Sequence, residues 1–488
     1  MINTRINTLG EDTNDLANQR KYADRVRLLL AEKRERLGRA LKVCVQTFGC
    51  QQNEADSERL VGTALSLGYE KAEGLDTADL IIYNTCAVRE HAELKALSKT
   101  GQLKHIKAIN PEMLVGLWGC MVSQEHRVSD IRNKYPYVDF VAGTNMLHRL
   151  PEILCDVMVN KRRRYYVDEG DSAIVEGVPV ERENDIKAWL SIMYGCDNFC
   201  TYCVVPHVRG RERSRRPEEI LSEARGLVAD GCKEITLLGQ NVNSYGKGLA
   251  ESIGFARLLK DVASLDGDYW VRFMTSHPKD VSEELIEVIR SCDRVAKHFH
   301  LPVQSGSNRI LKLMNRRYTA ESYLRVVEKL RAAVPDITLT TDIIVGFPGE
   351  TEEDFAKTLE LVERVGYDSI FSFIYSPRKG TPAAEFDDPV SYEEKTERFA
   401  RLMALHHEII TGINAGYVGK TIKVLCETPS DALSDVQDSA PDAEFTGRSS
   451  GNKLIRFTAP QGSALYGTFV NVKITRAGDV QLYGELVR

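Results

Sequence analysis

Hydrophobic and polar residues alternate in blocks along most of this chain. Residues 1–40 are polar and charge-mixed, with a helix-like stretch inside them. Beyond them, short apolar runs rich in β-forming residues alternate with segments of helical spacing. The first series contains four such runs, at residues 42–48, 79–85, 113–118 and 138–144. This alternation predicts a parallel sheet covered by helices.

A second series of the same kind begins near residue 189. It contains six apolar runs, at residues 189–195, 234–240, 270–276, 297–303, 338–347 and 369–375. Six successive βα units predict an incomplete barrel of the TIM type, and residues 391–415 are expected to form one long closing helix. Between the two series, residues 155–187 carry a basic KRRR run and no clear strand, which is typical of a connection.

Closely spaced strand-like runs follow the long helix. They lie at residues 420–426, 453–459, 467–477 and 482–487, separated by turn-forming residues. This spacing predicts a small C-terminal β-barrel. The expected fold class is therefore α/β multidomain, with a parallel α/β sheet domain, a partial (β/α)6 barrel and a small β-barrel. The expected parts are a partly ordered leader at 1–40, the sheet domain at 41–157, a connection at 158–181, the barrel at 182–415 and the β-domain at 416–488.

The overall composition is that of an ordinary globular protein. Of 488 residues, 43% are hydrophobic and 27% charged, and no apolar run is long enough for a signal peptide or a membrane span. We therefore expect a cytoplasmic protein with no membrane partner. In a reducing compartment, eleven cysteines favour metal binding or catalysis over disulfides. The net charge of −6 means that any nucleic-acid site must be a local basic surface.

Three cysteines of the first series occupy equivalent places. Cys50, Cys86 and Cys120 each lie just past the carboxyl end of a predicted strand, 36 and 34 residues apart. Because parallel strands share one carboxyl edge, the three thiols should converge there. A single cysteine at a strand end is usually a buried core residue; three in succession favour a three-thiolate metal site. No matching partners exist for the remaining cysteines, which we assign to cores or surfaces: Cys44, Cys155, Cys232, Cys292 and Cys426.

A second set of three cysteines lies in the segment GCDNFCTYC, directly after the first strand of the predicted barrel. Cys196, Cys200 and Cys203 have CxxxCxxC spacing. An iron–sulfur cubane normally takes four thiolates, so three leave one iron open to a substrate or cofactor. A zinc site with His207 as fourth ligand is the alternative.

This spacing, with Tyr202 before the last cysteine, resembles the signature of the radical S-adenosylmethionine (SAM) enzymes. Together with the other cysteine triad and the C-terminal β-domain, the chain from about residue 41 onward resembles the methylthiotransferases, whose C-terminal domain is the RNA-binding TRAM domain. The motifs TFGCQQNEADSE, NTCAVRE, GCMVSQ and LPVQSGSNRILKLMNRRYT are similar to the MiaB-type branch, which modifies tRNA. One departure is Gln52, which stands where that branch commonly has Met.

The resemblance implies a specific activity and cofactor set. It implies two 4Fe–4S clusters, one on Cys196, Cys200 and Cys203 that binds SAM. The other, on the first triad, donates sulfur and makes that triad catalytic. Two SAM molecules per turnover would serve as methyl donor and radical source. The implied substrate is a tRNA anticodon stem-loop carrying N6-isopentenyladenosine, methylthiolated at C2. Implied partners are a flavodoxin or ferredoxin electron donor and a sulfur or iron–sulfur delivery protein.

Further candidates lie at strand ends and in basic runs. The expected SAM contacts are Tyr202, Gln240, Asn241, Ser276, Gln304, Asp342 and Gly346. The expected RNA contacts are Arg209, Arg211, Arg213, Lys420, Lys423, Lys473 and Arg476. Polar strand ends and charged surfaces are common in any protein, so each residue alone has an ordinary structural explanation. Two other functions stay open: a methylthiotransferase for threonylcarbamoyladenosine tRNA or a ribosomal protein, and a non-catalytic iron–sulfur carrier.

Overall fold

The computed structural model describes residues 12–88, 90–167, 174, 176–250, 253–428 and 442–487. Two compact units divide the chain. The first comprises Met1–Glu183, Tyr194–Asp197 and Cys203–Arg213, and the second comprises Asn184–Met193, Asn198–Tyr202 and Ser214–Arg488. Among the described helices, none is both long and apolar enough to cross a membrane.

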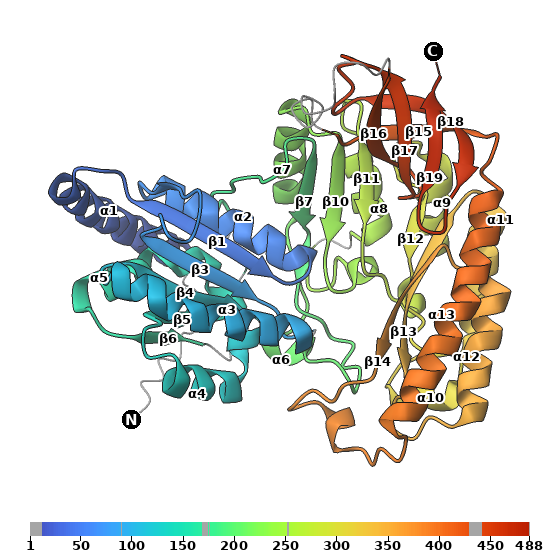
Figure 1. The fold of residues 1–488 in the computed structure, drawn as a ribbon, viewed down its shortest axis with the longest axis horizontal. Helices are drawn as coiled ribbons and strands as arrows, with labels where there is room; N and C mark the ends of the chain where they lie inside the picture. Colours follow the sequence, from blue (N-terminus) through green and yellow to red (C-terminus); the bar gives the residue numbers. More distant parts are fainter. Residues whose placement is uncertain are drawn as a thin grey trace. The chain divides into compact units, whose positions relative to one another are not determined.

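A six-stranded parallel sheet forms the first unit, in the order β2-β1-β3-β4-β5-β6 (Figure 1). Its strands are β1 (Lys42–Phe48), β2 (Glu70–Lys71), β3 (Leu80–Thr85), β4 (Leu114–Gly119), β5 (Phe140–Ala142) and β6 (Arg164–Tyr166). The four predicted apolar runs are β1, β3, β4 and β5, so the predicted parallel sheet is confirmed. The strand order reverses between β1 and β3, and doubly wound sheets bind ligands outside the carboxyl ends at such a point.

Helices cover both faces of this sheet. They are α1 (Asp12–Leu37), α2 (Gln51–Ser66), α3 (Glu90–Ile109), α4 (Glu125–Lys134) and α5 (Leu150–Asn160), and the short α6 (Val205–Arg209) also belongs to the unit. One core packs side chains of α1, α2 and α5, such as Leu30, Leu60 and Leu154, against one face. A separate core packs Leu103 of α3 and Ile131 of α4 against the other. The helix expected within residues 1–40 is α1.

The segment expected to be strandless contributes the edge strand β6. Its three residues pair with β5 in parallel, as Phe140↔Arg164 to Ala142↔Tyr166. The expectation was wrong because the run Arg-Tyr-Tyr is basic and aromatic and has no apolar alternation. Downstream, the chain lies along α2, where Glu181 N donates to Glu58 O at 3.0 Å. The predicted domain boundaries stay predictions.

The second unit contains six parallel strands arranged as a partial barrel. They are β7 (Lys187–Ser191), β10 (Glu234–Leu238), β11 (Trp270–Phe273), β12 (His298–His300), β13 (Thr338–Val345) and β14 (Ser369–Ile374). Two hydrogen-bonded sets, β11-β10-β7 and β12-β13-β14, meet at a bridge between Val271 and Val295. The predicted partial (β/α)6 barrel is confirmed.

Helices pack around the outside of this barrel, and Figure 1 shows α12 and α13 alongside β13 and β14. The helices are α7 (Pro217–Ala229), α8 (Phe255–Ala263), α9 (Glu283–Ser291), α10 (Asn308–Leu313), α11 (Ala320–Ala333), α12 (Glu352–Val365) and α13 (Tyr392–Ala415). Alternate strand residues such as Leu237, Phe299 and Leu339 point into the apolar layer between strands and helices. The long helix expected at 391–415 is α13.

The C-terminal strands close into a small barrel, as predicted, in the order β15-β16-β17-β19-β18. They are β15 (Thr421–Cys426), β16 (Asp442–Ser449), β17 (Leu454–Pro460), β18 (Phe469–Ala477) and β19 (Leu482–Leu486). The strand β16 was missed, because its acidic start resembles the turn-rich stretch before it. Its alternation of buried Ala443 and Phe445 with outward polar residues was the available signal.

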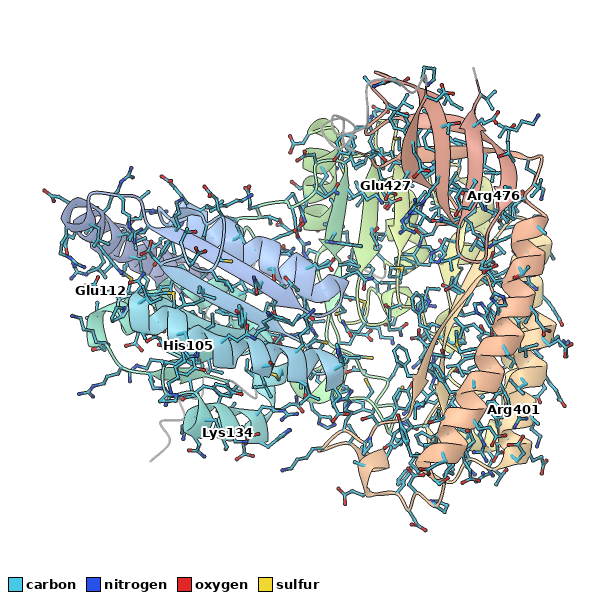
Figure 2. The ribbon with its side chains drawn as sticks, in the orientation of Figure 1. His105, Glu112, Lys134, Arg401, Glu427 and Arg476 are labelled. Carbon is cyan, nitrogen blue, oxygen red and sulfur yellow. The ribbon has the colours of Figure 1, made fainter. Side chains whose placement is uncertain are left out.

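Polar contacts join this small barrel to the amino-end floor of the partial barrel. Arg272 of β11 forms a buried ion pair with Glu234 of β10 at 2.5 Å. Its guanidinium also donates to the carbonyls of Ser450 and Ser449, at 2.6 and 2.7 Å. Lys187 Nζ of β7 lies 2.5 Å from Glu427 Oε1. Figure 2 labels Glu427 at the small barrel. The ion pair on the floor is therefore completed by the small barrel.

Replacing Arg272 tests this junction. Arg272→Ala leaves the Glu234 carboxylate buried without its cation, and removing one partner of a buried pair typically costs about 3–5 kcal/mol. Chemical unfolding should show a loss of that size, and hydrogen exchange should show weaker protection of β16 and β17. The control is Arg257→Ala, which removes an exposed pair with Asp261; equal stability of the two variants would contradict this account.

Candidate functional site

The cysteines of the first triad lie at one edge of the first sheet. Cys50 follows β1 and caps α2, Cys86 follows β3, and Cys120 follows β4. The strands are in register, with Phe48 opposite Thr85 and Thr85 opposite Gly119. The thiol of Cys86 hydrogen-bonds to that of Cys50, and Cys86 and Cys120 are each only 2% exposed. The three cysteines therefore lie at the same edge of the sheet, and Cys50 and Cys86 are in contact.

An asparagine pair shapes the backbone under these thiols. Asn53 donates to Asn84 Oδ1 at 3.1 Å and to Thr85 O at 3.2 Å. Asn84 donates back to Asn53 O at 2.8 Å. The glycines beside the cysteines leave room for this pair: a Cβ on Gly49 would lie 2.4 Å from Asn53 Oδ1, and one on Gly119 would lie 2.5 Å from Asn84 Oδ1. Both asparagines fall inside the quoted cysteine motifs, but sequence reasoning gave them no role.

Arg209 of α6 is buried against the same thiols. It is 4% exposed, and its Nε donates to Cys120 Sγ at 3.1 Å. Its Nη2 forms an ion pair with the buried Asp56 at 2.9 Å. This burial argues against the expected contact between Arg209 and RNA phosphate, because the guanidinium faces protein groups. Arg209 instead supplies a positive charge and a hydrogen bond to the first triad.

These surroundings favour a thiolate at Cys50. The hydrogen bond from Cys86, and next the positive charge of Arg209, lower the pKa of Cys50 to about 5 against the opposing effect of burial. Backbone N–H groups at the start of α2 act in the same direction. The shared hydrogen bond, together with burial, raises the pKa of Cys86. Burial raises the pKa of Cys120 as well, so among the three thiols these surroundings favour the thiolate form at Cys50.

The second triad lies in a tightly turned loop after β7. Gly195 has a φ of +72°, and a Cβ there would lie 2.0 Å from the carbonyl oxygen of Arg211. Cys196 and Cys200 are buried, whereas Cys203 is half-buried. Thr201 N donates to Met314 O at 3.1 Å, and Asn315 Nδ2 donates to Phe199 O at 2.9 Å. Residues 314–315 therefore fix the part of the loop around Cys200.

A second buried arginine faces this loop. Arg316 is 8% exposed, and its Nη1 donates to Cys200 Sγ at 3.4 Å. Its Nη2 donates to Pro302 O at 2.8 Å, and Tyr318 OH accepts from its Nε at 3.0 Å. Arg316 belongs to the motif LMNRRYT, which sequence reasoning used only as a family marker. Each triad thus has a buried guanidinium that donates to one of its sulfurs.

The expected SAM contacts lie at the carboxyl ends of the barrel strands. Asn241, after β10, is 1% exposed; its Nδ2 donates to Asp280, while its Oδ1 has no partner among the described residues. The buried Ser276 Oγ, after β11, likewise has no partner in the described part of the chain. Gln240 is half-buried, and Tyr202 packs against a small core near β13. Such unsatisfied buried groups cost about 1–3 kcal/mol each, so a ligand that bonds them is favoured.

The backbone at these strand ends is unusual. Thr275 and Gln304 have φ of 64° and 72°, a region that non-glycine residues rarely adopt. Gln304 N donates to Asp342 O at 2.8 Å and Ile344 N donates to Gln304 O at 3.0 Å, which places Gln304 against β13. The Asp342 carboxylate is partly exposed and lies 3.5 Å from His300 Nε2. Gln304 and Asp342 are therefore adjacent at one strand end.

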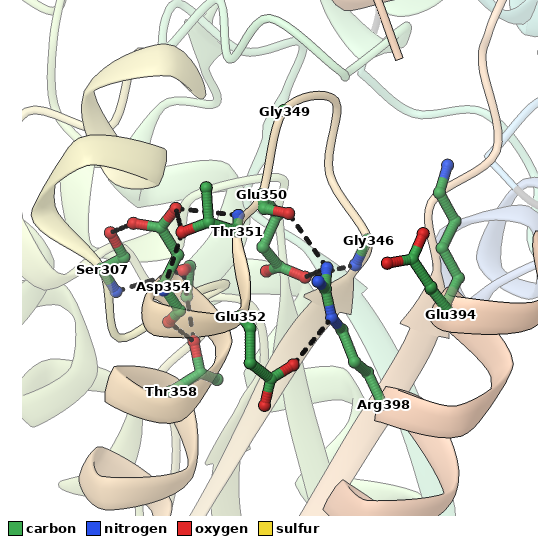
Figure 3. Close-up of polar contacts among 12 residues, drawn as sticks. Ser307, Gly346, Gly349, Glu350, Thr351, Glu352, Asp354, Thr358, Glu394 and Arg398 are labelled. Carbon is green, nitrogen blue, oxygen red and sulfur yellow. Dashed lines mark hydrogen bonds and ion pairs between the residues drawn. The ribbon is translucent and has the colours of Figure 1, made fainter. Parts of the chain in front are cut away.

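A buried carboxyl group holds the GFPGE turn that follows β13 (Figure 3). Glu350 Oε2 accepts from Gly346 N at 2.8 Å, and Arg398 Nη1 donates to Glu350 O at 2.9 Å. Gly346 has a φ of +70°, and a Cβ there would lie 2.3 Å from Lys395 Cγ. Burial raises the pKa of Glu350 to about 7. Glu350 and Arg398 were not identified from the sequence.

Comparison with known proteins fits this arrangement. The Radical SAM superfamily matches residues 190–362, and "Uncharacterized protein family UPF0004" matches residues 42–143. The tRNA-2-methylthio-N(6)-dimethylallyladenosine synthase of Acetivibrio thermocellus is 46% identical over 97% of both chains. Proteins of the same name from Clostridium perfringens and Alkaliphilus oremlandii are 49% identical, over 91% and 92% of this chain and 97% and 94% of theirs.

The chain belongs to the tRNA-2-methylthio-N(6)-dimethylallyladenosine synthase family. Among solved structures, the radical SAM methyltransferase TsrM from Kitasatospora setae, with tryptophan substrate and a SAM analog bound, has a TM-score of 0.53 at 13% identity. It covers 75% of this chain and 89% of its own, and it supports the fold alone. The recognised family and the MiaB-type branch are thereby confirmed.

Membership of the radical SAM superfamily implies a 4Fe–4S cluster and SAM, and the residues present fit both. Within the described ranges, no three His, Cys, Asp or Glu side chains already surround a metal position. The fit therefore rests on donor chemistry. Thiolates are the ligands that iron–sulfur clusters take, and Arg316 donates a hydrogen bond to Cys200 Sγ. The unsatisfied Asn241 and Ser276 oxygens suit a polar ligand such as SAM.

The basic candidates of the C-terminal barrel are exposed, and Lys420, Lys423 and Arg476 lie next to aromatic rings. Lys423 Nζ lies 4.4 Å from the centre of the Phe469 ring, and the Arg476 guanidinium lies 3.5 Å from that of Tyr483. Lys473 pairs with Thr421 across β18 and β15, and Lys420 precedes β15. Cations interleaved with aromatic rings are typical of surfaces that grip single-stranded RNA.

The remaining arginine candidates differ from Arg209. Arg211 is exposed and pairs with Asp197 at 2.7 Å. Arg213 is half-buried, and its Nη2 donates to Asn145 Oδ1 at 3.2 Å and to Arg209 O at 3.1 Å. Only Arg211 therefore retains the exposure that an RNA contact requires.

The raised pKa of Glu350 predicts a pH-dependent stability. The protonated carboxyl is favoured in the fold, so its contribution is complete below the ordinary glutamate pKa of 4.5 and is lost as the pH rises through about 7. Glu350→Gln should match the parent protein near pH 4. By pH 8, chemical unfolding should show it to be more stable by roughly 3 kcal/mol. Glu363→Gln, at an exposed carboxylate of α12, is the control; parallel curves for Glu350→Gln and the parent would refute the assignment.

Proposed function

We propose that this protein is a tRNA methylthiotransferase that converts N6-isopentenyladenosine beside the anticodon into its 2-methylthio derivative. The observation that carries the proposal is the pair of cysteine triads, each with one buried arginine, in a chain 46–49% identical to named synthases. A sulfur-inserting enzyme needs thiolate-rich positions for two tasks, SAM cleavage and sulfur supply. A non-catalytic carrier would not need the polar strand ends of a SAM barrel.

In this proposal the two triads hold separate 4Fe–4S clusters. Cys196, Cys200 and Cys203 would bind the cluster that chelates SAM, and Cys50, Cys86 and Cys120 would bind one with an iron position open to sulfur. When bound and reduced, the SAM-binding cluster would give access to radical chemistry at the adenine C2–H bond. Acid–base groups cannot usefully polarise that bond. The cysteine roles, the SAM contacts and the five-part domain division are parts of this proposal.

The protein's own residues bind and orient the reactants. Arg209 and Arg316 hold positive charge beside the thiolates and, being arginines, cannot lose it by deprotonation. The buried oxygens of Asn241 and Ser276 are available as acceptors for SAM. Gly346, whose N–H is held by Glu350, leaves room for the Lys395 side chain to pack against the β13 turn.

The proposal also requires partners that act before and during turnover. Reductive SAM cleavage consumes an electron, so a flavodoxin or ferredoxin must supply it. Inserted sulfur must be replaced, so a sulfur or iron–sulfur delivery protein is needed. The tRNA base must leave its stack to expose C2, as enzymes acting on bases generally require.

Nucleoside analysis of a deletion strain tests the proposed function. Digested tRNA should lack 2-methylthio-N6-isopentenyladenosine, accumulate N6-isopentenyladenosine, and recover the product when the gene is returned. Methylthio-threonylcarbamoyladenosine and ribosomal proteins should be unchanged. If the isopentenyladenosine pool is unaltered and either methylthio-threonylcarbamoyladenosine or a ribosomal protein changes, this substrate assignment is wrong.

Cysteine variants separate the two triads. Anaerobically reconstituted protein should hold about eight iron atoms per chain, and replacing either triad by alanine should leave about four. The Cys196/Cys200/Cys203 variant should lose SAM cleavage. The Cys50/Cys86/Cys120 variant should retain SAM cleavage and make no methylthio product. Normal product formation by the latter would disprove the sulfur-supply role.

Surface substitutions test the RNA grip. Replacing the four exposed barrel cations by alanine should weaken tRNA binding and reduce the slope of log K against log salt by roughly three, since each phosphate contact contributes about 0.7–0.9. The substituted residues are Lys420, Lys423, Lys473 and Arg476. Substitution is preferable to deletion, because removing the barrel exposes the Arg272 ion pair. An unchanged slope would exclude this surface as the grip.

A further inference from the structure

Two sequence features have no role in the proposed chemistry, and they meet at one cavity in the first unit. One is the basic end of α1, in the leader, and the other is the KRRR run that follows α5. A cavity of about 450 Å3 is lined by residues from both. Small-molecule sites usually occupy roughly 300–1,000 Å3, so the cavity is large enough for a ligand.

The cavity lies at the amino edge of the sheet, opposite the cysteines. Its lining includes Asp79 immediately before β3, Leu114 at the start of β4 and Asp139 immediately before β5. The thiols follow the other ends of β3 and β4. Ligands of doubly wound sheets usually bind at the carboxyl edge, so this cavity is a feature separate from the cysteine site.

Its lining carries more positive charge than negative. Three carboxylates are present, and all are already paired: Asp79 with Arg39 at 2.7 Å, Asp139 with Lys107 at 2.5 Å, and Glu112 with Arg36 at 2.5 Å. Figure 2 labels Glu112 at this end of the unit. Arg39, the partner of Asp79, is not part of the lining.

The KRRR run supplies cations that no carboxylate neutralises. The side chains of Lys161 and Arg162 have no acceptor within the described part of the chain, and that of Arg163 donates only to backbone carbonyls, such as Val138 O at 3.0 Å. Lys161 also caps α5 in a left-handed conformation with a φ of 50°, where glycine is the usual residue. A lysine is therefore held at a strained backbone position on the cavity rim.

The cavity also has an apolar wall. Leu30 of α1, Tyr69 and Val157 line it together with Met158 of α5. Two adjacent unneutralised cations match a dianionic phosphate better than a monoanionic carboxylate, and the arginine fork pairs with phosphate oxygens. An apolar wall beside them suits the base and ribose of a nucleotide.

We propose that this cavity binds a nucleotide, with its phosphate on Lys161 and Arg162 and its base along the wall formed by Leu30 and Met158. The nucleotide comes either from solution or from an RNA strand. Binding of a free nucleotide would be independent of the proposed function, whereas binding of an RNA nucleotide rests on it.

The test uses two variants that change the site in different ways. Lys161→Gly with Arg162→Ala removes both cations and relieves the strained cap, so the fold should be retained. Met158→Trp fills the cavity and keeps every charge; Leu30→Trp replaces it if that variant fails to fold. The control is Lys99→Ala with Lys104→Ala, two exposed cations of α3 outside the cavity lining.

Binding is measured on reconstituted full-length protein with saturating SAM, so that the barrel site is filled. Calorimetry with AMP and ATP, and anisotropy with an anticodon stem-loop RNA, distinguish the two sources. Saturable binding of free nucleotide, weakened at least about tenfold by both cavity variants and not by the control, supports a soluble ligand. If free nucleotides do not bind, and both cavity variants but not the control weaken RNA binding, the ligand is a nucleotide of an RNA strand.

Three results would overturn the proposal. The first is that neither cavity variant alters the binding of free nucleotide or of the stem-loop RNA. Another is an effect of charge removal without any effect of Met158→Trp, which would indicate an open basic surface. The third is an effect of cavity filling without any effect of charge removal, which would exclude phosphate recognition. Methylthio product in the deletion-strain assay is independent of these results, so failure here leaves the proposed function intact.

Discussion

Thiolates that lie close together away from water repel one another. A buried positive charge beside them offsets that repulsion. Arg209 meets Cys120 at 3.1 Å and Arg316 meets Cys200 at 3.4 Å. A buried arginine would itself be costly without acceptors, so Asp56 supports the first and the Pro302 carbonyl supports the second. The chemistry of both triads therefore depends on a small network of charge that lies behind the sulfurs.

The fold positions these networks through backbone register. Because β1, β3 and β4 end level with one another, three cysteines about one βα unit apart arrive at the same edge. The asparagines beneath them fix the turns, and the glycines beside them leave the necessary space. A side chain at Gly49 or Gly119 would collide with Asn53 or Asn84 and so displace the turns that carry Cys50 and Cys120.

Sequence reasoning succeeded where a regular pattern carried the information. The six-strand barrel, the C-terminal β-barrel, α13 and the strand-end positions of Cys50, Cys86 and Cys120 followed from hydrophobic period and spacing. It failed where partners distant in sequence decide the role. Arg209 and Arg211 look alike in RGRERSRR, yet only tertiary packing makes one a buried neighbour of Cys120 and leaves the other exposed. The strand β6 was missed for a related reason, since its pairing with β5 outweighs its weak local pattern.

The contacts of Arg272 with the small barrel have a consequence for how the protein is made. The carbonyl of Ser449 that completes the floor of the partial barrel lies 177 residues after Arg272 in the chain. At synthesis rates of about 5–20 residues per second, the ribosome needs roughly 9–35 seconds to deliver it. Throughout that interval the nascent barrel has an unfinished floor, with the Arg272–Glu234 pair open to solvent. The partial barrel therefore gains the last two acceptors of Arg272 only after residues 449 and 450 have been synthesised.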